Sequence, residues 1–178
     1  MKNTSEGARH QANRPPVPAD TGSRPTIDAA HYVPWYLSVL NNGLASSGSR
    51  LYRKLFGIGL NEWRMLSALV NEPGAMANRV GELIVCNKSQ VSRSLRVLED
   101  KGLAQTRISE GNRLLYLTDA GEALHDKVIK IALAREAALM EGFSDAERTG
   151  LFALMERLRG NLDRVDAFDA ELVNGHKG

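Results

Sequence analysis

The sequence contains too few cysteines for disulfide bridges or for cysteine-based metal clusters. Cys86 is its single cysteine, which excludes an intramolecular disulfide and any Cys-x-x-Cys metal knuckle. The four histidines are scattered, and only His125-Asp126 places a carboxylate directly beside one, so we expect no metal and no cofactor. A chain without disulfides fits the reducing cytoplasm best.

Long apolar runs and common enzyme motifs are also missing. No stretch of about 18 apolar residues occurs, so we expect no transmembrane helix and no membrane partner. Residues 1–26 lack the apolar core of a secretory signal and are rich in Pro, Gly, Ser and Asn, so we expect a disordered tail. Gly-x-Ser-x-Gly, a phosphate loop and His-Glu-x-x-His are all absent, which argues against an enzyme.

What the sequence does have is an uneven distribution of charge. Residues 50–113 carry eleven Lys and Arg against six Asp and Glu, a net charge of +5. Residues 114–178 carry eight against twelve, a net charge of −4. A basic middle and an acidic end suggest that one region binds a polyanion and the other does not.

Apolar residues recur at helical spacing through the first half of the chain beyond the tail. We expect a long first helix that ends near residue 56, although Gly43 and Gly48 interrupt its pattern. A second helix follows and stops at Pro73-Gly74, and a short third helix comes next. The residues predicted to face inward are Trp63, Leu66, Leu69 and Val70 in the second helix and Val80, Leu83 and Ile84 in the third.

The stretch NKSQVSRSLRVLEDKGL predicts a fourth helix, from about Lys88 to Lys101. Asn87 can cap its first turn, and Gly102 lies where a helix would end. Its aliphatic residues, at steps of four and three, are Val91, Leu95 and Leu98. They form one apolar stripe. The other faces are basic and hydrogen-bonding, which fits either a solvated surface or a binding surface.

After this helix the periodicity changes. Residues 103–109 and 113–118 favour two strands, and Glu110-Gly111-Asn112 between them favours a hairpin turn. A long helix is expected from about Asp119 to Glu141. Ser144 and Glu147 form a capping box that opens the last helix. The apolar face of that last helix is predicted as Leu151, Leu154, Met155, Leu158, Leu162 and Val165.

Two helices, a basic helix and a two-stranded hairpin follow one another in the order of a winged helix-turn-helix. The segments GLNEWRMLSAL, NKSQVSRSLRVLEDKGL, YLTDAGEAL and FSDAERTGLFALMERLRGNL resemble the MarR family of bacterial transcriptional regulators. The resemblance implies a mainly α fold, an α+β winged helix-turn-helix between dimer-forming N- and C-terminal helices. The implied parts are a dimerisation helix at 27–58, the DNA-binding domain at 59–118 and dimerisation helices at 119–178.

The resemblance also implies a function. It implies a homodimer that binds pseudo-palindromic double-stranded DNA, with one helix of each protomer in a major groove and the wing in a minor groove. Small effectors, often aromatic acids, change the spacing of the two recognition helices. We therefore expect a cytoplasmic repressor that a small aromatic effector releases from its operator. A winged-helix protein–protein adaptor without specific DNA binding is the alternative.

The residues expected to contact DNA are Lys88, Ser89, Gln90, Ser92, Arg93 and Arg96 in the recognition helix and Arg107 and Arg113 in the wing. Gln90 suits adenine and Arg93 suits guanine, whereas Ser92 and Arg96 suit phosphates. The sequence departs from the family in two places. The turn before the recognition helix usually holds a glycine, where this chain has Val85 and Cys86, and the wing tip SEGNR lacks the Asp-x-Arg that the family often carries.

Aromatic and basic residues suggest an effector pocket. Its predicted members are His31, Trp35, Tyr36, Arg50, Arg53 and Trp63, with aromatic walls and a cation for a carboxylate. The alternative is that both tryptophans belong to the core and the cations to the surface. The segment LYRKLFGIGLNEWRM resembles a subgroup that senses hydroxycinnamic compounds and their coenzyme A thioesters. Arg50, Arg53 and Lys54 would then bind phosphates.

Cys86 precedes the recognition helix, and two interpretations of it stay open. Helix N-termini activate thiols, so Cys86 could act as an oxidation switch. Alternatively, it is a small apolar residue in a tight turn. We favour the second interpretation, because a redox switch needs a partner or an exposed thiolate.

Overall fold

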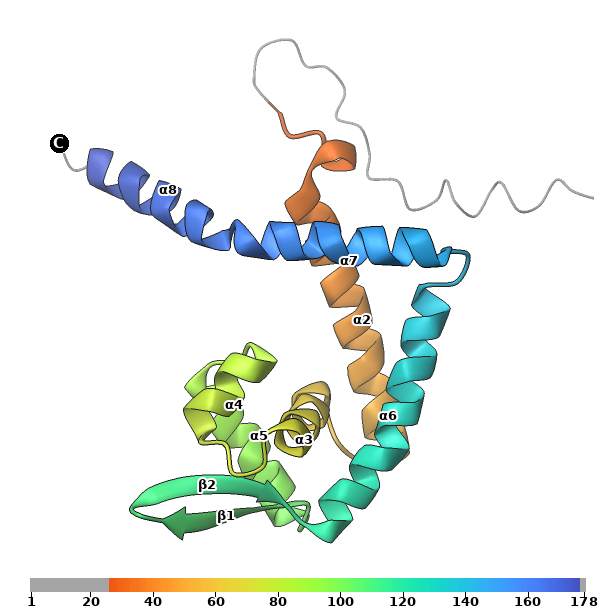
Figure 1. The fold of residues 1–178 in the computed structure, drawn as a ribbon, viewed down its shortest axis with the longest axis vertical. Coiled ribbons are helices and arrows are strands. Elements are labelled where there is room, and N and C mark those ends of the chain that lie inside the picture. Colours follow the sequence, from red (N-terminus) through yellow and green to blue (C-terminus); the bar gives the residue numbers. More distant parts are fainter. Residues whose placement is uncertain (1–25, 177–178) are drawn as a thin grey trace, which may run out of the picture. The chain divides into compact units, whose positions relative to one another are not determined.

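The computed structural model describes residues 26–176, so nearly all of the predicted tail lies outside the described residues. The described residues divide into two compact units, one up to Val128 and one from Ile129 onward. Figure 1 labels the helices α2 to α8 and both strands. The elements in chain order are η1 Ala29–His31, α2 Val33–Phe56, α3 Leu60–Asn71, α4 Ala77–Ile84, α5 Lys88–Asp100, β1 Ala104–Ser109, β2 Asn112–Leu117, α6 Asp119–Leu139, α7 Asp145–Gly160 and α8 Leu162–Gly175. None of the helices within 26–176 is both long and apolar enough to cross a membrane.

The first unit is built around α3, which packs against α2, α4, α5 and β2. Its least exposed side chains come from α3 itself, from α4, α5 and β2, and from the loop that joins α2 to α3. They include Ile58, Met65, Leu66, Leu69, Val80, Val91, Leu98 and Leu115, all below 2% exposed. Aliphatic burial of this kind is the main favourable contribution to folding. The core therefore fixes α5 against α3 and leaves the opposite side of α5 uncovered.

Two inward-facing predictions were wrong, and both have the same cause. Val70 in α3 is 40% exposed and Leu83 in α4 is 38% exposed. Each borders an open hollow of the first unit rather than a neighbouring helix. Met65 of α3 was not among the residues predicted to face inward, yet its side chain is fully buried. The helical period was right, but it could not show where a neighbouring element ends.

The hairpin confirms the predicted wing. β1 and β2 pair antiparallel with Ser109 opposite Asn112, so the turn consists of Glu110 and Gly111. Both turn residues have positive φ, 51° and 78°, as a type I′ turn requires. Thr106 donates a hydrogen bond to Glu99 across 2.6 Å, which ties β1 to the last turn of α5.

The LTDAG motif has a physical explanation at the start of α6. The Thr118 hydroxyl donates to the Gly102 carbonyl across 2.6 Å and accepts the Gly121 N–H across 3.1 Å. A Cβ on Gly121 would lie 2.0 Å from the Leu103 carbonyl oxygen. Only glycine allows α6 to begin this close to the end of the recognition helix.

The second unit contains the end of α6 together with α7 and α8. The predicted capping box is confirmed, since the Glu147 N–H donates to the Ser144 hydroxyl and the Ser144 N–H donates to the Glu147 carboxylate. The last helix is not continuous, because α7 ends at Gly160 and α8 begins at Leu162. No residue of α7 or α8 is buried, and both carry large exposed apolar side chains.

Candidate nucleic-acid interface

The recognition helix α5 begins where the sequence predicts. The Asn87 side chain accepts the Gln90 N–H across 2.9 Å, and the Gln90 carboxamide oxygen accepts the Asn87 N–H across 3.2 Å. This reciprocal pair satisfies two of the backbone donors that the first turn leaves free. The helix therefore starts at a fixed residue, and Lys88 and Ser89 lie exposed in its first turn.

The two faces of α5 are separated as the amphipathic pattern predicts. Val91, Leu95 and Leu98 are buried against the first unit. The exposed residues include Lys88, Ser89, Ser92, Arg93 and Arg96. Lys88, Ser89, Ser92 and Arg93 lie in the first two turns, at the end of the helix that enters deepest in a helix-turn-helix, and Arg96 adds a third cation one turn further on.

The side chains on this surface differ in how freely they can move. Arg93 donates through Nε to the Ser89 carbonyl across 3.3 Å, which leaves its terminal nitrogens available. Arg96 lies 4.0 Å from Asp100, and this pair is 85% and 72% exposed, so water competes with it strongly. Gln90 is more constrained, because its carboxamide oxygen already serves the cap. Bidentate contact of Gln90 with adenine would require that cap to open.

Ser94 holds the recognition helix in place, and the sequence patterns did not identify it. It is 4% exposed and donates to Glu62 of α3 across 2.6 Å. The same carboxylate accepts the Gly59 N–H across 2.7 Å. Glu62 therefore holds the start of α3 and the middle of the recognition helix together. The only signal for it in the sequence is a serine within the apolar stripe of α5.

Replacing Ser94 with alanine should therefore destabilise the fold. The change removes a hydrogen bond to a carboxylate, for which we expect a loss of about 1.5 kcal/mol in the free energy of unfolding. Urea unfolding followed by circular dichroism measures this. Ser92→Ala is the matched control, because Ser92 is exposed on the same helix and its loss should stay within about 0.5 kcal/mol. Equal stability of the two variants would contradict a structural role for Ser94.

The turn between α4 and α5 takes an unusual form. Val85 adopts the left-handed conformation with φ 53° and ψ 53°, in the turn where the family usually has a glycine. The Cys86 N–H donates to the Gly81 carbonyl across 2.9 Å. The Cys86 thiol is half-buried and lies 3.8 Å from the Asn61 side-chain oxygen. The turn therefore closes without the glycine.

The two predicted wing arginines lie on opposite faces of the hairpin. Arg113 is opposite Ile108, on the face that also holds Thr106 and its contact with α5. Successive residues of a strand alternate between faces, so Arg107 lies on the other face. There its guanidinium lies 4.6 Å from the centre of the Tyr116 ring. Arg113 is thus the wing cation on the recognition-helix side.

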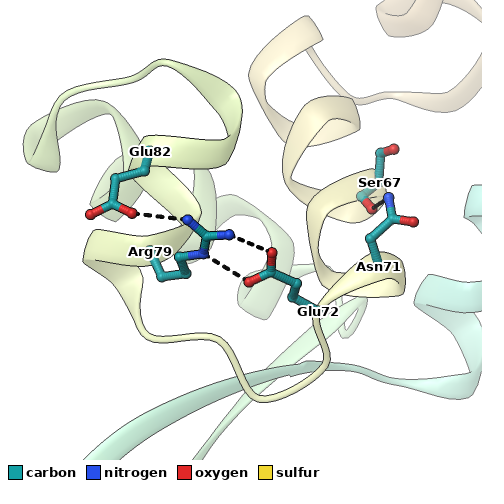
Figure 2. A network of polar contacts seen from close by, with 5 residues as sticks. All are labelled: Ser67, Asn71, Glu72, Arg79 and Glu82. Atoms are coloured by element: carbon teal, nitrogen blue, oxygen red, sulfur yellow. Dashed lines mark hydrogen bonds and ion pairs between the residues drawn. The ribbon is translucent and has the colours of Figure 1, made fainter.

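A separate ion-pair network fixes α4 rather than contacting the recognition surface (Figure 2). Arg79 donates to both oxygens of Glu72 across 2.7 and 2.9 Å and to Glu82 across 3.1 Å. The hydrogen bonds that Arg79 donates to Glu72 lower the pKa of that carboxyl, and its hydrogen bonds to Glu72 and Glu82 raise the pKa of Arg79. With two carboxylates engaged, Arg79 is a structural cation.

An open cavity of about 770 Å³ lies in the first unit between α2, α3 and the end of α4. It is lined by Asn41, Trp63, Arg64, Ser67, Ala68, Asn71, Leu83, Ile84 and Val85. Figure 2 includes two of these, Ser67 and Asn71, where the Asn71 amide donates to the Ser67 carbonyl across 2.8 Å. Arg64 forms no ion pair within residues 26–176. The cavity thus combines an indole wall, a cation and amide groups.

Of the residues predicted for an effector pocket, only Trp63 lines this cavity. Its ring stacks on His125 and packs beside Tyr52. Trp35 and Tyr36 contact each other at the start of α2, whereas Arg50 lies fifteen residues further on and bonds Ser46. Fifteen helical residues span about 22 Å, so one small ligand cannot touch both ends within one protomer. His31 bonds Asp28, and Arg53 is exposed near the end of α2.

Comparison with known proteins agrees with this geometry. The family described as "Sugar-specific transcriptional regulator TrmB" matches residues 53–118, which contain the helix-turn-helix and the wing. An uncharacterized HTH-type transcriptional regulator, YybA of Bacillus subtilis (strain 168), is 23% identical over 106 residues, 58% of this chain and 71% of YybA. The TrmB match begins at residue 53, so it leaves out the cavity residue Asn41.

Solved structures extend the likeness over most of the chain. A MarR/EmrR family transcriptional regulator from Acinetobacter sp. ADP1 is 28% identical, with a TM-score of 0.73 over 78% of this chain and 99% of that one. The S. aureus MepR–DNA complex is 18% identical, with a TM-score of 0.67 over 75% and 98%. PcaV from Streptomyces coelicolor, in complex with its natural ligand, is 22% identical, with a TM-score of 0.64 over 77% and 98%.

The capped basic helix, its preceding turn and the wing define a DNA-binding transcriptional regulator of the winged-helix class. Regulators described as MarR-type account for several of the high-scoring neighbours, and their chains are matched almost end to end. The protein is a winged helix-turn-helix transcriptional regulator that is similar to MarR-type regulators over most of its length, so the resemblance predicted from its sequence is confirmed.

Proposed function

We propose that this regulator acts in the cytoplasm as a homodimeric repressor that a small aromatic effector releases from a pseudo-palindromic operator. The observation that carries the proposal is the uncovered face of α5, where Lys88, Arg93 and Arg96 are exposed around a capped N-terminus. Arg93 is the proposed guanine reader and Arg96 a proposed phosphate contact. Arg113 supplies the wing cation on the same side of the hairpin as Thr106.

Homodimer formation is supported by the apolar faces left open on the two units. In α2 the exposed residues include Tyr36, Leu37, Leu40 and Leu44, and α7 and α8 carry Leu154, Leu158, Leu162, Phe168 and Leu172. A single protein of this size exposing so many large apolar residues along its helices needs a partner surface. A second copy supplies the same faces, and a two-fold dimer places two recognition helices about one DNA turn apart.

The open cavity is the proposed effector site. Its volume falls in the range of about 300–1,000 Å³ typical of small-molecule sites. Trp63 supplies an apolar wall and Arg64 a cation for a carboxylate. Arg50, Arg53 and Lys54 lie at the end of α2 that packs beside Trp63 through Tyr52, so they suit the phosphates of a coenzyme A thioester. A ligand there changes DNA affinity only by its preference for one arrangement of the recognition helices.

The DNA proposal is tested by fluorescence anisotropy on the intergenic DNA upstream of the gene, at two salt concentrations. We expect Arg93→Ala to lose roughly tenfold in affinity for that DNA and little for random DNA, because it removes a base contact. Arg96→Ala is the matched comparison, and should weaken both DNAs alike and lower the salt slope by about one. Equally weak binding of wild type to both DNAs would favour the adaptor alternative.

The effector proposal uses the same complex. Hydroxycinnamic acids and their coenzyme A thioesters are added at micromolar concentration, and release of the DNA is expected. Trp35→Phe leaves Trp63 as the single tryptophan, so ligand entering the cavity should quench its fluorescence at the concentration that releases DNA. Release without a change at Trp63 would place the ligand elsewhere, and no release by any of these compounds would exclude this ligand class.

A further inference from the structure

Two apolar side chains are far more exposed than any other large apolar residue in the described part of the chain. Val85 is 90% exposed and Ile108 is 79% exposed, whereas the next, Ile27, is 61% exposed. Both lie in the DNA-binding unit, Val85 in the turn before α5 and Ile108 in the wing. Ile108 lies in an extended strand, a conformation that β-branched residues favour. Val85 has no such explanation.

The backbone of Val85 makes valine an unfavourable choice. Its φ of 53° and ψ of 53° fall in the left-handed region, which β-branched residues rarely adopt. The turn is closed by backbone hydrogen bonds from the Val85 N–H to Glu82 and from the Cys86 N–H to Gly81. Those bonds would be equally available to glycine. With 90% of the side chain exposed, the valine also adds almost nothing to the core.

The position of Val85 indicates the role of its side chain. It comes two residues before the cap Asn87 and three before Lys88, at the end of α5 that enters deepest in a helix-turn-helix. Together with Ala77, Asn78, Asn87 and Lys88 it borders a hollow of about 690 Å³ at this turn. Val85 also touches the rim of the proposed effector cavity, but so exposed a side chain covers little of that wall.

We propose that Val85 is a DNA contact that recognises the C5-methyl group of a thymine beside the bases read by α5. The thymine methyl is the distinctive apolar feature of the major groove, and aliphatic side chains recognise it by contact. Backbone strain retained at an exposed position is characteristic of functional sites. The proposal rests on DNA binding through α5 and adds an apolar specificity determinant to its basic face.

The test begins with operator selection. Wild type, Val85→Gly and Val85→Ala each select sites from a random duplex library, and the wild-type consensus gives the reference operator. Each thymine of that operator is then replaced singly by uracil, which removes only the C5-methyl group. We expect wild type to lose about fivefold in affinity at one position per half-site, as burial of a methyl group predicts. Val85→Gly should be insensitive to uracil at that position.

Controls separate a contact from a change in fold. Val97→Ala makes the same kind of truncation on the last turns of α5 and should keep the uracil sensitivity of wild type. The thermal midpoint of Val85→Gly should be no lower than that of wild type, because glycine relieves the left-handed strain. If that variant is unstable, Val85→Ala keeps the backbone restraint and gives the same comparison.

The outcomes distinguish this inference from the proposed function. Failure of wild type to select any consensus would overturn the proposed function itself. Selection by wild type, with identical uracil sensitivity in the Val85 variants, would overturn only the thymine contact. Uniform weakening of the Val85 variants on all duplexes would also overturn it, because it would assign Val85 to backbone contact rather than to base recognition.

Discussion

Gly121→Ala should lower the free energy of unfolding by about 3 kcal/mol, at the upper end of the usual cost of overpacking. The added Cβ would lie 2.0 Å from the Leu103 carbonyl oxygen and 3.0 Å from the Leu103 carbonyl carbon. Both are backbone atoms, so no side-chain rotation can relieve the clash. The start of α6 would have to move away from the end of the recognition helix.

Thermal unfolding measures this effect, and we expect the midpoint to fall by about 10 °C. Gly43→Ala is the matched control, because a Cβ there meets nothing within 4 Å inside α2. That variant should gain roughly 0.5–1 kcal/mol from the higher helix propensity of alanine. If glycine-to-alanine lowers the free energy of unfolding at Gly121 and raises it at Gly43, the loss at Gly121 comes from its close approach to the Leu103 carbonyl. A stable Gly121→Ala protein would contradict it.

The recognition helix could be predicted because its determinants are local. The aliphatic stripe, the cap at Asn87 and the terminating Gly102 all lie within seventeen residues, and each corresponds to a known physical requirement. The hairpin turn was likewise predictable, because Gly111 at its second position suits the positive φ of 78° there. Elements specified by their own residues were therefore recovered nearly to the residue.

The parts that the sequence could not predict depend on contacts between distant residues. Ser94 and Glu62 are 32 residues apart, and nothing in either local sequence indicates that they bond. Val70 and Leu83 match the helical period but border open hollows. Four of the predicted effector residues lie on α2, but they are divided between its two ends. A cluster in sequence becomes a cluster in space only when the helical rise allows it.

The missing glycine at the turn shows how a departure from a pattern becomes informative. The sequence revealed only that Val85 and Cys86 occupy the place where the family usually has a glycine. In the structure the turn is kept, and Val85 adopts the left-handed conformation that a glycine would adopt there. The chain therefore differs from the family in the side chain at this turn and not in the backbone. The inference about thymine recognition follows from that difference.

Leu158→Glu should abolish specific DNA binding while leaving each protomer folded. Leu158 is 41% exposed on α7, among other large apolar residues that a second copy would cover. Burial of an unpaired carboxylate in such an interface costs several kcal/mol, so the dimer should dissociate. A monomer binds only one half-site, and loss of the second contact should reduce operator affinity by about a hundredfold or more.

Light scattering and anisotropy test the two halves of this prediction. Thr149→Glu is the matched control, because it adds the same charge nine residues away, two and a half turns round α7 and therefore on the opposite face. It should remain dimeric and bind the operator as wild type does. A Leu158→Glu protein that is dimeric would place the interface elsewhere. A monomeric variant with full operator affinity would show that dimerisation is not needed for DNA recognition.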